Sequence, residues 1–581
     1  MSTRRFLVTA FLLYLSLTCL MTYPQVLHLR DGVHDDGDPL LNAWTLAWVA
    51  HQLPRAPARL FDANIFYPER RTLAFSETLL LPALVMAPLR WLGVGPLLVY
   101  NVVLLSGFVL SGVGVALLVR TLTGWIGPAL VAGIVFAFLP FRIDHYAHMQ
   151  LQQTQCLPFA LWAFHRLLAR GRVRDGAVFG AFSAGQLLSC VYYGLLMIPY
   201  LAVVCATLLL GHARGAAQRT RDGRVALAIV VAIAIVLVAA VPVGMAYVGA
   251  RKVVGERGRD EVVNGSATLL DYLGPPPENA LYGKALGHFA EQERRLFPGF
   301  VAVALAGVGL WSRSGSRRTD RSGRTDGSGR TETSGIANGR ATDAVAKIAY
   351  ALGLLIAFDI SLGYHGLTYP LLYEYFVPFR ALRIPARNGI IVGLSLAVLA
   401  GYGVAHMAAM VRSPAARRIV LAAIGALIVA EYASRPIRMI AMPLAPPAAY
   451  GDVVRDRGDS PTATLFEFPL SSKDDPTYMY FSTFHWQHLV NGYSGFFPPA
   501  YVFLANAVDS IPDNASIHAI KSHGARYLLL HGERLILPRY NELVAQLDAR
   551  PELTVLSRTP VVRNGERSEI SVYRISYVEN R

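Results

Sequence analysis

The stretch LLVYNVVLLSGFVLSGVGVALLV, from Leu97 to Val119, decides the class of fold, because it contains no charged side chain. As a helix it matches the roughly 20 residues that cross about 30 Å of hydrocarbon. Comparable apolar runs lie at 6–24, 125–141, 152–169, 176–190, 191–210, 225–248, 297–312, 345–362, 388–411 and 419–434. We therefore predict an all-α polytopic transmembrane bundle with about eleven spans.

The composition of the whole chain agrees with this prediction. Of its 581 residues, 53% are hydrophobic and only 16% are charged, which excludes an ordinary soluble protein. The net charge of +15 sits in loops beside the apolar runs and in Ser312–Arg340. It therefore indicates contact with anionic membrane lipids rather than nucleic acid. Residues 313–343 are too polar to form a core, so we expect a flexible cytoplasmic loop there.

Arginines in the short loops set the predicted orientation. Arg4 and Arg5 place the N-terminus in the cytoplasm, and one crossing for each run brings Arg120 and the later arginine-rich loops to the same side. A full crossing at Glu77–Trp91 would turn Arg120 outward, so this segment is predicted to be re-entrant. The first run lacks a small-residue cleavage pattern and is expected to remain as an anchor.

The character of the chain changes after Tyr432. We predict a transmembrane domain at 1–434, with an external loop at 25–96, and a small soluble extracytoplasmic α/β domain at 435–581. Within that domain, strands are expected at 463–468, 527–531, 553–557 and 570–575, with helices near 514–523 and 538–549. An aromatic segment, Tyr478–Trp486, either docks this domain on the bundle, which we prefer, or binds carbohydrate by stacking.

The first external loop carries the segment HDDGDPLLNAW, from His34 to Trp44, at a predicted bilayer surface. Carboxylates beside hydrocarbon are costly unless they are paired, solvated or used, so Asp35, Asp36 and Asp38 are the first candidates for chemistry. A plainer interpretation makes Asp38 the cap of a helix that starts at Pro39. The spacing of Asp36 and Asp38 also suits a divalent cation, but no further ligands are evident, so no metal site is assigned.

Residues 39–53, which follow this cluster, predict an amphipathic helix in the membrane interface. Trp44 and Trp48 are four residues apart and therefore share one helical face, which we expect at headgroup depth. Glu77, at the mouth of the re-entrant segment, is a further outward-facing acid.

Several motifs resemble those of a group of bacterial GT-C-like membrane proteins. They are Gly37–Trp44, Asn64–Pro68, Phe138–Arg142 with His145 and His148–Gln150, Arg383–Arg387, Phe484–Trp486 and Asn491–Gly495. The order of the parts resembles the GT-C superfamily of membrane glycosyltransferases. The resemblance implies a protein of the plasma (inner) membrane. It also implies a GT-C type glycosyltransferase that moves a hexosyl or pentosyl group from a polyprenyl-phosphate sugar to a saccharide, lipid or protein acceptor.

The same resemblance implies roles for individual residues. The base of an inverting reaction, which takes the proton of the acceptor hydroxyl, falls to Asp38 or Asp36. Substrate-binding roles fall to Asp35, Glu77, Arg142, His145, His148, Arg251, Arg383 and Arg387, with the arginines as forks for the lipid phosphate. Taken singly, each arginine is explained more simply as charge solvated in the headgroup layer, and the two histidines as structural. A divalent cation stays open as a cofactor.

Two functions of other classes remain open. A transporter or flippase for a lipid or polysaccharide precursor would also use a polytopic bundle, but the sequence shows no inverted repeat and little charge at mid-bilayer. A non-catalytic GT-C-like scaffold is the other, because a fold does not fix a function. The surroundings of the acidic cluster distinguish these alternatives from a transferase.

Overall fold

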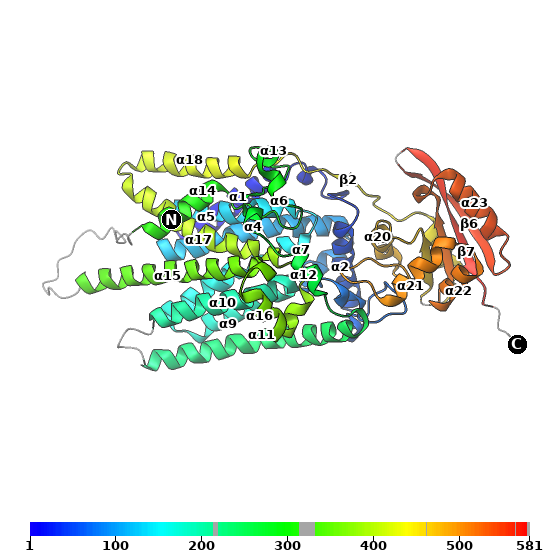
Figure 1. Cartoon of the computed structure of the whole chain (residues 1–581), viewed down its shortest axis with the longest axis horizontal. Helices are drawn as coiled ribbons and strands as arrows, with labels where there is room; N and C mark the ends of the chain where they lie inside the picture. The colour runs from blue at the N-terminus through cyan, green and yellow to red at the C-terminus, as the bar shows by residue number, and fades with distance from the viewer. Residues whose placement is uncertain (213–218, 313–331, 461, 564, 578–581) are drawn as a thin grey trace. The chain divides into compact units, whose positions relative to one another are not determined.

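A computed structural model describes residues 1–212, 219–312, 332–460, 462–563 and 565–577 (Figure 1). Of the predicted cytoplasmic loop at 313–343, residues 313–331 lie outside the described residues. Its last part, which was expected to be loop, belongs to a helix that starts at Glu332.

The chain divides into two compact units. Unit 1 contains Met1–Val26, Leu104–Val241 and Glu256–Ile437, and unit 2 contains Leu27–Val103, Pro242–Gly255 and Arg438–Arg581. The first external loop and the C-terminal residues, which the sequence places more than three hundred residues apart, thus belong to the same unit. The predicted domain boundary at 434 lies close to the point where the last segment of unit 2 begins.

Unit 1 is helical. Its helices are α1 (Thr3–Met21), α5 (Ile126–Ala137), α6 (Pro140–Asp144), α7 (Met149–Gln152), α8 (Cys156–Arg170), α9 (Val173–Ser189), α10 (Val191–His212), α12 (Arg259–Asn264), α13 (Gly283–Leu286), α14 (Phe300–Trp311), α15 (Glu332–Ser361), α16 (Thr368–Tyr375), α17 (Gly389–Met410) and α18 (Pro414–Tyr432). Short 3₁₀ turns are η4 (Leu270–Leu273), η5 (Gly287–Phe289), η6 (Gly363–His365), η7 (Val377–Ala381) and η8 (Pro385–Asn388). The boundary between the units falls inside α4 (Pro96–Thr123) and α11 (Arg219–Val254), and η1 (Gln25–Leu27) also crosses it.

Among the described residues, 7 helices are long and apolar enough to cross a membrane. They are Thr3–Met21, Pro96–Thr123, Ile126–Asp144, Val191–Gly211, Gly223–Val254, Asp343–Ser361 and Pro385–Met410. The other predicted runs are also helical, as α8, α9, α14 and α18, but these helices are shorter or more polar. The protein is an integral membrane protein with an all-α bundle, and the number of about eleven spans stays a prediction.

The segment predicted to be re-entrant forms α3 (Leu80–Trp91), which has 12 residues. This length is well below what a membrane crossing needs, which favours a partial insertion. Elsewhere in the bundle, α14 packs against α17 through small residues. A Cβ added at Gly309 would overlap the carbonyl oxygen of Leu399, and one at Gly403 would overlap that of Leu305. Glycine at both positions therefore allows the two backbones to approach closely.

Unit 2 is mixed. Its helices are α2 (Asp38–Gln52), α3, α19 (Ala449–Asp456), α20 (Asp475–His485), α21 (Pro499–Ala507), α22 (Asn514–Ser522) and α23 (Leu537–Asp548). Its strands are β1 (Gly32–Val33), β2 (Ile440–Ala441), β3 (Thr464–Phe468), β4 (His488–Leu489), β5 (Tyr527–His531), β6 (Leu553–Arg563) and β7 (Glu566–Ile575). The 3₁₀ turns are η2 (Pro57–Arg59), η3 (Thr72–Phe75), η9 (Val508–Ser510) and η10 (Gly532–Arg534).

The strands of the C-terminal segment form a 5-stranded sheet with the order β4-β3-β5-β7-β6. β3 runs parallel to β4 and β5, with Leu465 opposite Tyr527, whereas β7 runs antiparallel to β5 and β6. The predicted strands and helices are present. The last two strands are longer than predicted, because their polar ends pair with each other in a hairpin. Polar side chains hid this extension from a search for apolar runs.

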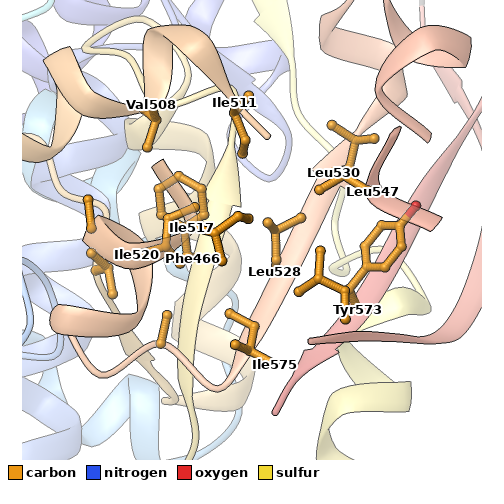
Figure 2. Packing of buried hydrophobic residues seen from close by; sticks show 14 of the residues in the cluster. Phe466, Val508, Ile511, Ile517, Ile520, Leu528, Leu530, Leu547, Tyr573 and Ile575 are labelled. Atoms are coloured by element: carbon orange, nitrogen blue, oxygen red, sulfur yellow. The ribbon is translucent and has the colours of Figure 1, made fainter. Parts of the chain in front are cut away.

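The core of this sheet lies between its strands and the helices that follow them. Figure 2 shows Phe466, Leu528 and Leu530 from the two central parallel strands packed with Ile517 and Ile520 of α22. On the antiparallel side, Tyr573 of β7 and Leu547 of α23 join the same cluster. Burial of these side chains explains why a segment with alternating apolar residues forms an α/β domain.

A buried histidine links the ends of the two parallel strands β3 and β5. His531 Nε2 lies 2.8 Å from Glu467 Oε2, and its Nδ1 lies 2.9 Å from Glu533 Oε1. Tyr450 also donates its phenol proton to Glu467. Burial alone would lower the pKa of His531, but the two carboxylates raise it to about 9. The imidazole is therefore protonated at neutral pH and joins two strand ends by charged hydrogen bonds.

This pair of contacts predicts a pH-dependent stability. Because the pKa of His531 is higher in the folded state than its ordinary value of 6.5, its contribution is complete below that value and disappears as the pH rises through about 9. The shift corresponds to about 3 kcal/mol. The whole protein is unfolded in urea, and cleavage within residues 438–581 is followed by pulse proteolysis. His531→Gln should lower the urea midpoint of unfolding at pH 6, and should lower it much less at pH 10. The exposed His518 provides the control His518→Gln, whose effect should be small at both pH values.

Candidate functional site

The acidic cluster of the first external loop lies at the start of α2, in unit 2. Asp35, Asp36 and Asp38 are half-buried, and Asp35 Oδ1 accepts a hydrogen bond of 2.9 Å from the backbone N–H of Gly37. Asp38 Oδ1 accepts a hydrogen bond of 2.8 Å from the phenol of Tyr493. The cluster predicted from the sequence therefore receives a partner from the C-terminal segment of the same unit.

The helix-cap interpretation of Asp38 is wrong. The helix begins at Asp38 itself, and the capping position is occupied by Gly37, which has no side chain to cap the helix. A carboxylate in the first turn still interacts favourably with the helix dipole. The side chain of Asp38, however, is held by a residue that is remote in sequence, which a local cap does not explain.

The expected exposure of Trp44 and Trp48 to lipid headgroups is wrong, whereas a position of the helix in the membrane interface stays a prediction. All residues of α2 from Pro39 to Ala50 are buried. The Trp44 indole donates to Asn64 Oδ1 at 3.1 Å, and that of Trp48 donates to the carbonyl of Leu60 at 2.9 Å. The apolar character that suggested contact with headgroups instead fills the interior of unit 2.

The aromatic segment that precedes β4 packs on α2. The ring of Trp486 stacks on His51 with 3.9 Å between ring centroids, and it lies 6.0 Å from that of Trp48. These contacts join Tyr478–Trp486 to the first external loop, and both docking on the bundle and carbohydrate binding stay predictions.

A second polar cluster lies in unit 1, around Glu293. Arg387 grips this carboxylate with both ends of its guanidinium, through Nε to Oε2 at 3.1 Å and Nη2 to Oε1 at 2.9 Å. His145 Nε2 lies 3.1 Å from Oε2, and His148 Nε2 lies 3.6 Å from Oε1. We call these four residues the Glu293 cluster. Three of them were predicted to bind the phosphate of a substrate.

The charge of Glu293 is fixed by its neighbours. Burial by itself would raise the pKa of its carboxyl, but Arg387, His145 and His148 hold this pKa well below its usual range. The carboxylate is therefore ionised at neutral pH. Glu293 also has a φ of 74°, which is uncommon for a residue other than glycine. Its partners thus hold it in a backbone conformation that it would rarely adopt alone.

Arg142, which was predicted to bind substrate, has a structural position instead. Its side chain is completely buried, and its guanidinium donates to the carbonyl oxygens of Phe136 and Gln152 at 3.1 and 3.2 Å. A further hydrogen bond goes to the hydroxyl of Thr154. With its donors directed to the protein, this arginine braces the turn between α5 and α8, and we remove it from the predicted phosphate site.

The remaining predicted site residues lie elsewhere. Arg383 is exposed, close in sequence to Arg387 but without an ion pair to Glu293. Arg251 is exposed near the end of α11, and Glu77 is half-buried between η3 and α3. Their binding roles stay predictions. In the described part of the chain, no group of three or more His, Cys, Asp or Glu side chains is arranged to hold a metal ion.

The sequence analysis missed Glu293 and Tyr493. Glu293 belongs to the charged run EQERR at 291–295, between the apolar runs at 225–248 and 297–312. An acidic residue followed directly by two arginines was the available signal. Tyr493 belongs to a motif that had been noted, Asn491–Gly495, but no local pattern indicated that its phenol would meet Asp38.

Comparisons with known proteins support the fold. The arabinofuranosyltransferase AftD from Mycobacteria matches with a TM-score of 0.60 and 14% identity, over 99% of this chain and 40% of that chain. A mutant of the same enzyme matches with a TM-score of 0.59 and 14% identity, over 100% of this chain and 42% of that chain. This chain thus spans less than half the length of that enzyme.

A more distant likeness concerns the archaeal oligosaccharyltransferase AglB from Archaeoglobus fulgidus, solved with an inhibitory peptide and a dolichol-phosphate. It has a TM-score of 0.43 and 12% identity, over 97% of this chain and 74% of that chain. No curated protein matches the sequence.

The GT-C fold that the motifs predicted is confirmed by the likeness to the mycobacterial structures, which extends over almost the whole chain. At the level of sequence, a family model described as "Domain of unknown function (DUF6311)" matches residues 11–320, more than half of the chain. This protein therefore belongs to the DUF6311 family.

Proposed function

We propose that this protein is an inverting membrane glycosyltransferase, which moves a sugar from a polyprenyl-phosphate carrier to an acceptor hydroxyl on the extracytoplasmic face. The observation that carries the proposal is the oriented carboxylate of Asp38, in the first external loop of a GT-C fold. A half-buried acid with a fixed hydrogen-bond donor is suited to accept a proton in one defined direction.

The reaction needs a base because an acceptor hydroxyl is a weak nucleophile at neutral pH. In the proposed step, the acceptor oxygen forms a bond to the anomeric carbon, and the bond from that carbon to the phosphate oxygen breaks. The hydroxyl proton goes to Asp38, and the electron pair of the broken bond leaves with the polyprenyl phosphate. Attack opposite the leaving group inverts the anomeric carbon, and Asp36 is the neighbouring acid for a supporting role.

A lipid-linked phosphate needs positive partners to bind, and within unit 1 we propose Arg387, His145 and His148 for this role. Their present partner, the Glu293 carboxylate, is an anion held by the same fork that suits a phosphate. Glu293 stays ionised at neutral pH, so its carboxylate continues to bind these cationic side chains. A donor phosphate must therefore compete with the carboxylate for them. Glu293 therefore keeps the buried arginine neutralised until the lipid-linked anion takes its place.

This exchange predicts a gain of affinity in Glu293→Gln. The variant keeps the size of the side chain but removes the charge that a phosphate must displace, so polyprenyl phosphate should bind about tenfold more tightly. Calorimetry in detergent micelles measures the change, and Glu291→Gln, at an exposed acid of the same run, is the matched control. Weaker binding by Glu293→Gln would mean that the carboxylate is a permanent part of the site.

A donor panel tests the function itself. The whole protein in lipid nanodiscs is incubated with polyprenyl-phosphate hexoses and pentoses, including an arabinofuranose donor because of the similar mycobacterial enzyme. Each donor is offered with saccharide, lipid and peptide acceptors. We expect release of polyprenyl phosphate together with a glycosylated product for one pairing. Passage of an intact lipid-linked precursor across a liposome membrane, without cleavage, would instead favour the flippase alternative.

The same proposal includes the topology. The N-terminus is cytoplasmic and the C-terminal segment extracytoplasmic in the plasma (inner) membrane, which places Asp38 and the Glu293 cluster on the external side.

A further inference from the structure

The segment that carries Tyr493 is joined to the first external loop by main-chain hydrogen bonds. Leu489 of β4 donates to the carbonyl of Asn64 at 2.8 Å, and Tyr67 donates back to Leu489 at 2.9 Å. Phe66 then donates to the carbonyl of Asn491 at 3.0 Å. Loop residues 64–67 thus pair with the edge of the C-terminal sheet, in the manner of an added strand.

Asn491 fixes the chain just before Tyr493. Its side-chain oxygen accepts from the backbone N–H of Glu467 at 2.7 Å, and its amide donates to the Glu467 carbonyl at 2.8 Å. The same amide donates to the buried carboxylate of Asp475 at 2.9 Å. The oxygen and the NH₂ group of this amide thus tie the segment to β3 and α20.

Gly492 brings the backbone close to the loop. A Cβ at this position would lie 2.7 Å from ring atoms of Phe66, so a larger residue would push the two segments apart. Its N–H also donates to Asp475 at 3.2 Å. The next residue, Tyr493, lies with its ring beside that of Phe497, at 6.2 Å between ring centroids.

The other partner, Asp38, is held by the same framework. Asn64 accepts the indole proton of Trp44 in α2, and its amide donates to the carbonyl of Gln487 at 2.9 Å. Asn64 therefore joins the helix that begins with Asp38 to the segment that leads to Tyr493. The 2.8 Å hydrogen bond between Tyr493 and Asp38 closes this framework.

We infer that Tyr493 is a positioning residue for Asp38, so that the C-terminal segment completes the acidic site of the first loop. The inference rests on the proposed role of Asp38 as the base. The phenol donates a hydrogen bond to Oδ1, which restricts the rotation of the carboxylate that takes the proton of the acceptor. The negative charge of the carboxylate is also stabilised by a donor that does not itself react.

Tyr493→Phe tests this inference because it removes only the hydroxyl. We expect kcat to fall roughly ten- to hundredfold, while KM for the donor and the unfolding midpoint stay unchanged. The matched control is Tyr527→Phe in the same unit, whose phenol donates to Asp456 at 2.9 Å and not to Asp38. This control should lower the unfolding midpoint and leave kcat unchanged. Wild-type kcat in Tyr493→Phe, or parallel losses of kcat and stability in both variants, would overturn the inference.

A second readout needs no substrate. A carbodiimide labels accessible carboxyl groups, so loss of the hydroxyl that contacts Oδ1 should speed the labelling of Asp38 in Tyr493→Phe, as measured by peptide mass spectrometry. Labelling of Asp31, an acid of the same loop, should not change. Equal labelling of Asp38 in both proteins would contradict the inference.

The failure of the two ideas can be told apart. If Asp38→Asn retains transfer, the proposed base is wrong, whatever Tyr493 does. If Asp38→Asn is inactive and Tyr493→Phe is fully active, the base stands and only the positioning role fails.

Discussion

Asp38→Asn should abolish sugar transfer while leaving a folded membrane protein. The amide has nearly the same shape, and its oxygen can still accept the phenol proton of Tyr493, so the packing at the start of α2 should persist. It cannot take the proton of an acceptor hydroxyl. The loss of a general base corresponds to a fall in kcat of about 10²–10⁴-fold. Initial rates of product formation with the best donor of the panel measure this fall.

Two neighbouring acids serve as controls for that result. Asp31→Asn makes the same change in the same loop, at a side chain that is 43% exposed and lies 3.7 Å from His28. Its activity should equal that of the wild type. Asp36→Asn separates the two acids that the motif left open, and we expect a smaller loss than at Asp38. Full activity in Asp38→Asn with a large loss in Asp36→Asn would transfer the role of base to Asp36.

Arg387→Met should remove most of the affinity for the donor. The guanidinium donates two parallel hydrogen bonds, which Glu293 accepts in this structure. Methionine has no donor to replace them. We expect KM for the donor to rise about hundredfold, since charge-assisted contacts contribute roughly 1.5–3 kcal/mol each. The change is followed by donor titration of the transfer rate and by binding of polyprenyl phosphate.

The single variant also leaves Glu293 without its main partner. Breaking a fully buried ion pair costs about 3–5 kcal/mol, and because the side chain of Glu293 is 26% exposed, we expect a smaller loss of stability here. The double variant Arg387→Met with Glu293→Gln removes both charges and should recover stability but not donor affinity. Arg435→Met, at an exposed arginine of the same unit, should leave both properties unchanged. Normal donor affinity in the double variant would exclude the Glu293 cluster as the phosphate site.

Much of the fold could be predicted from local patterns. Runs such as 97–119 and 388–411 are helices because a backbone in hydrocarbon must satisfy its own hydrogen bonds. The strand at 527–531 was recognisable as a short apolar run, and the helix at 538–549 from the spacing of its apolar residues. The short strands β1 and β2 carry no such signal, because two residues do not establish a period.

The candidate site was predictable only in part. Motif resemblance led to Asp38, His145, His148 and Arg387, all of which make the polar contacts described above. It also led to Arg142, although the carbonyl groups around that guanidinium satisfy it inside the protein. An arginine in a pattern looks the same whether it meets a ligand or a backbone carbonyl. Only the positions of its partners distinguish the two cases.

The sequence alone therefore determined that this protein folds in a lipid bilayer, and it indicated the apolar helices and the loop in which chemistry is expected. It could do so because the length of an apolar run and the charge of a loop are properties of short segments. The tertiary structure decided which polar groups meet. Tyr493 and Asp38 are 455 residues apart in the sequence, and Arg387 and Glu293 are 94 apart. Such contacts depend on how distant segments pack, because a hydrogen bond needs its two atoms within about 3 Å of each other.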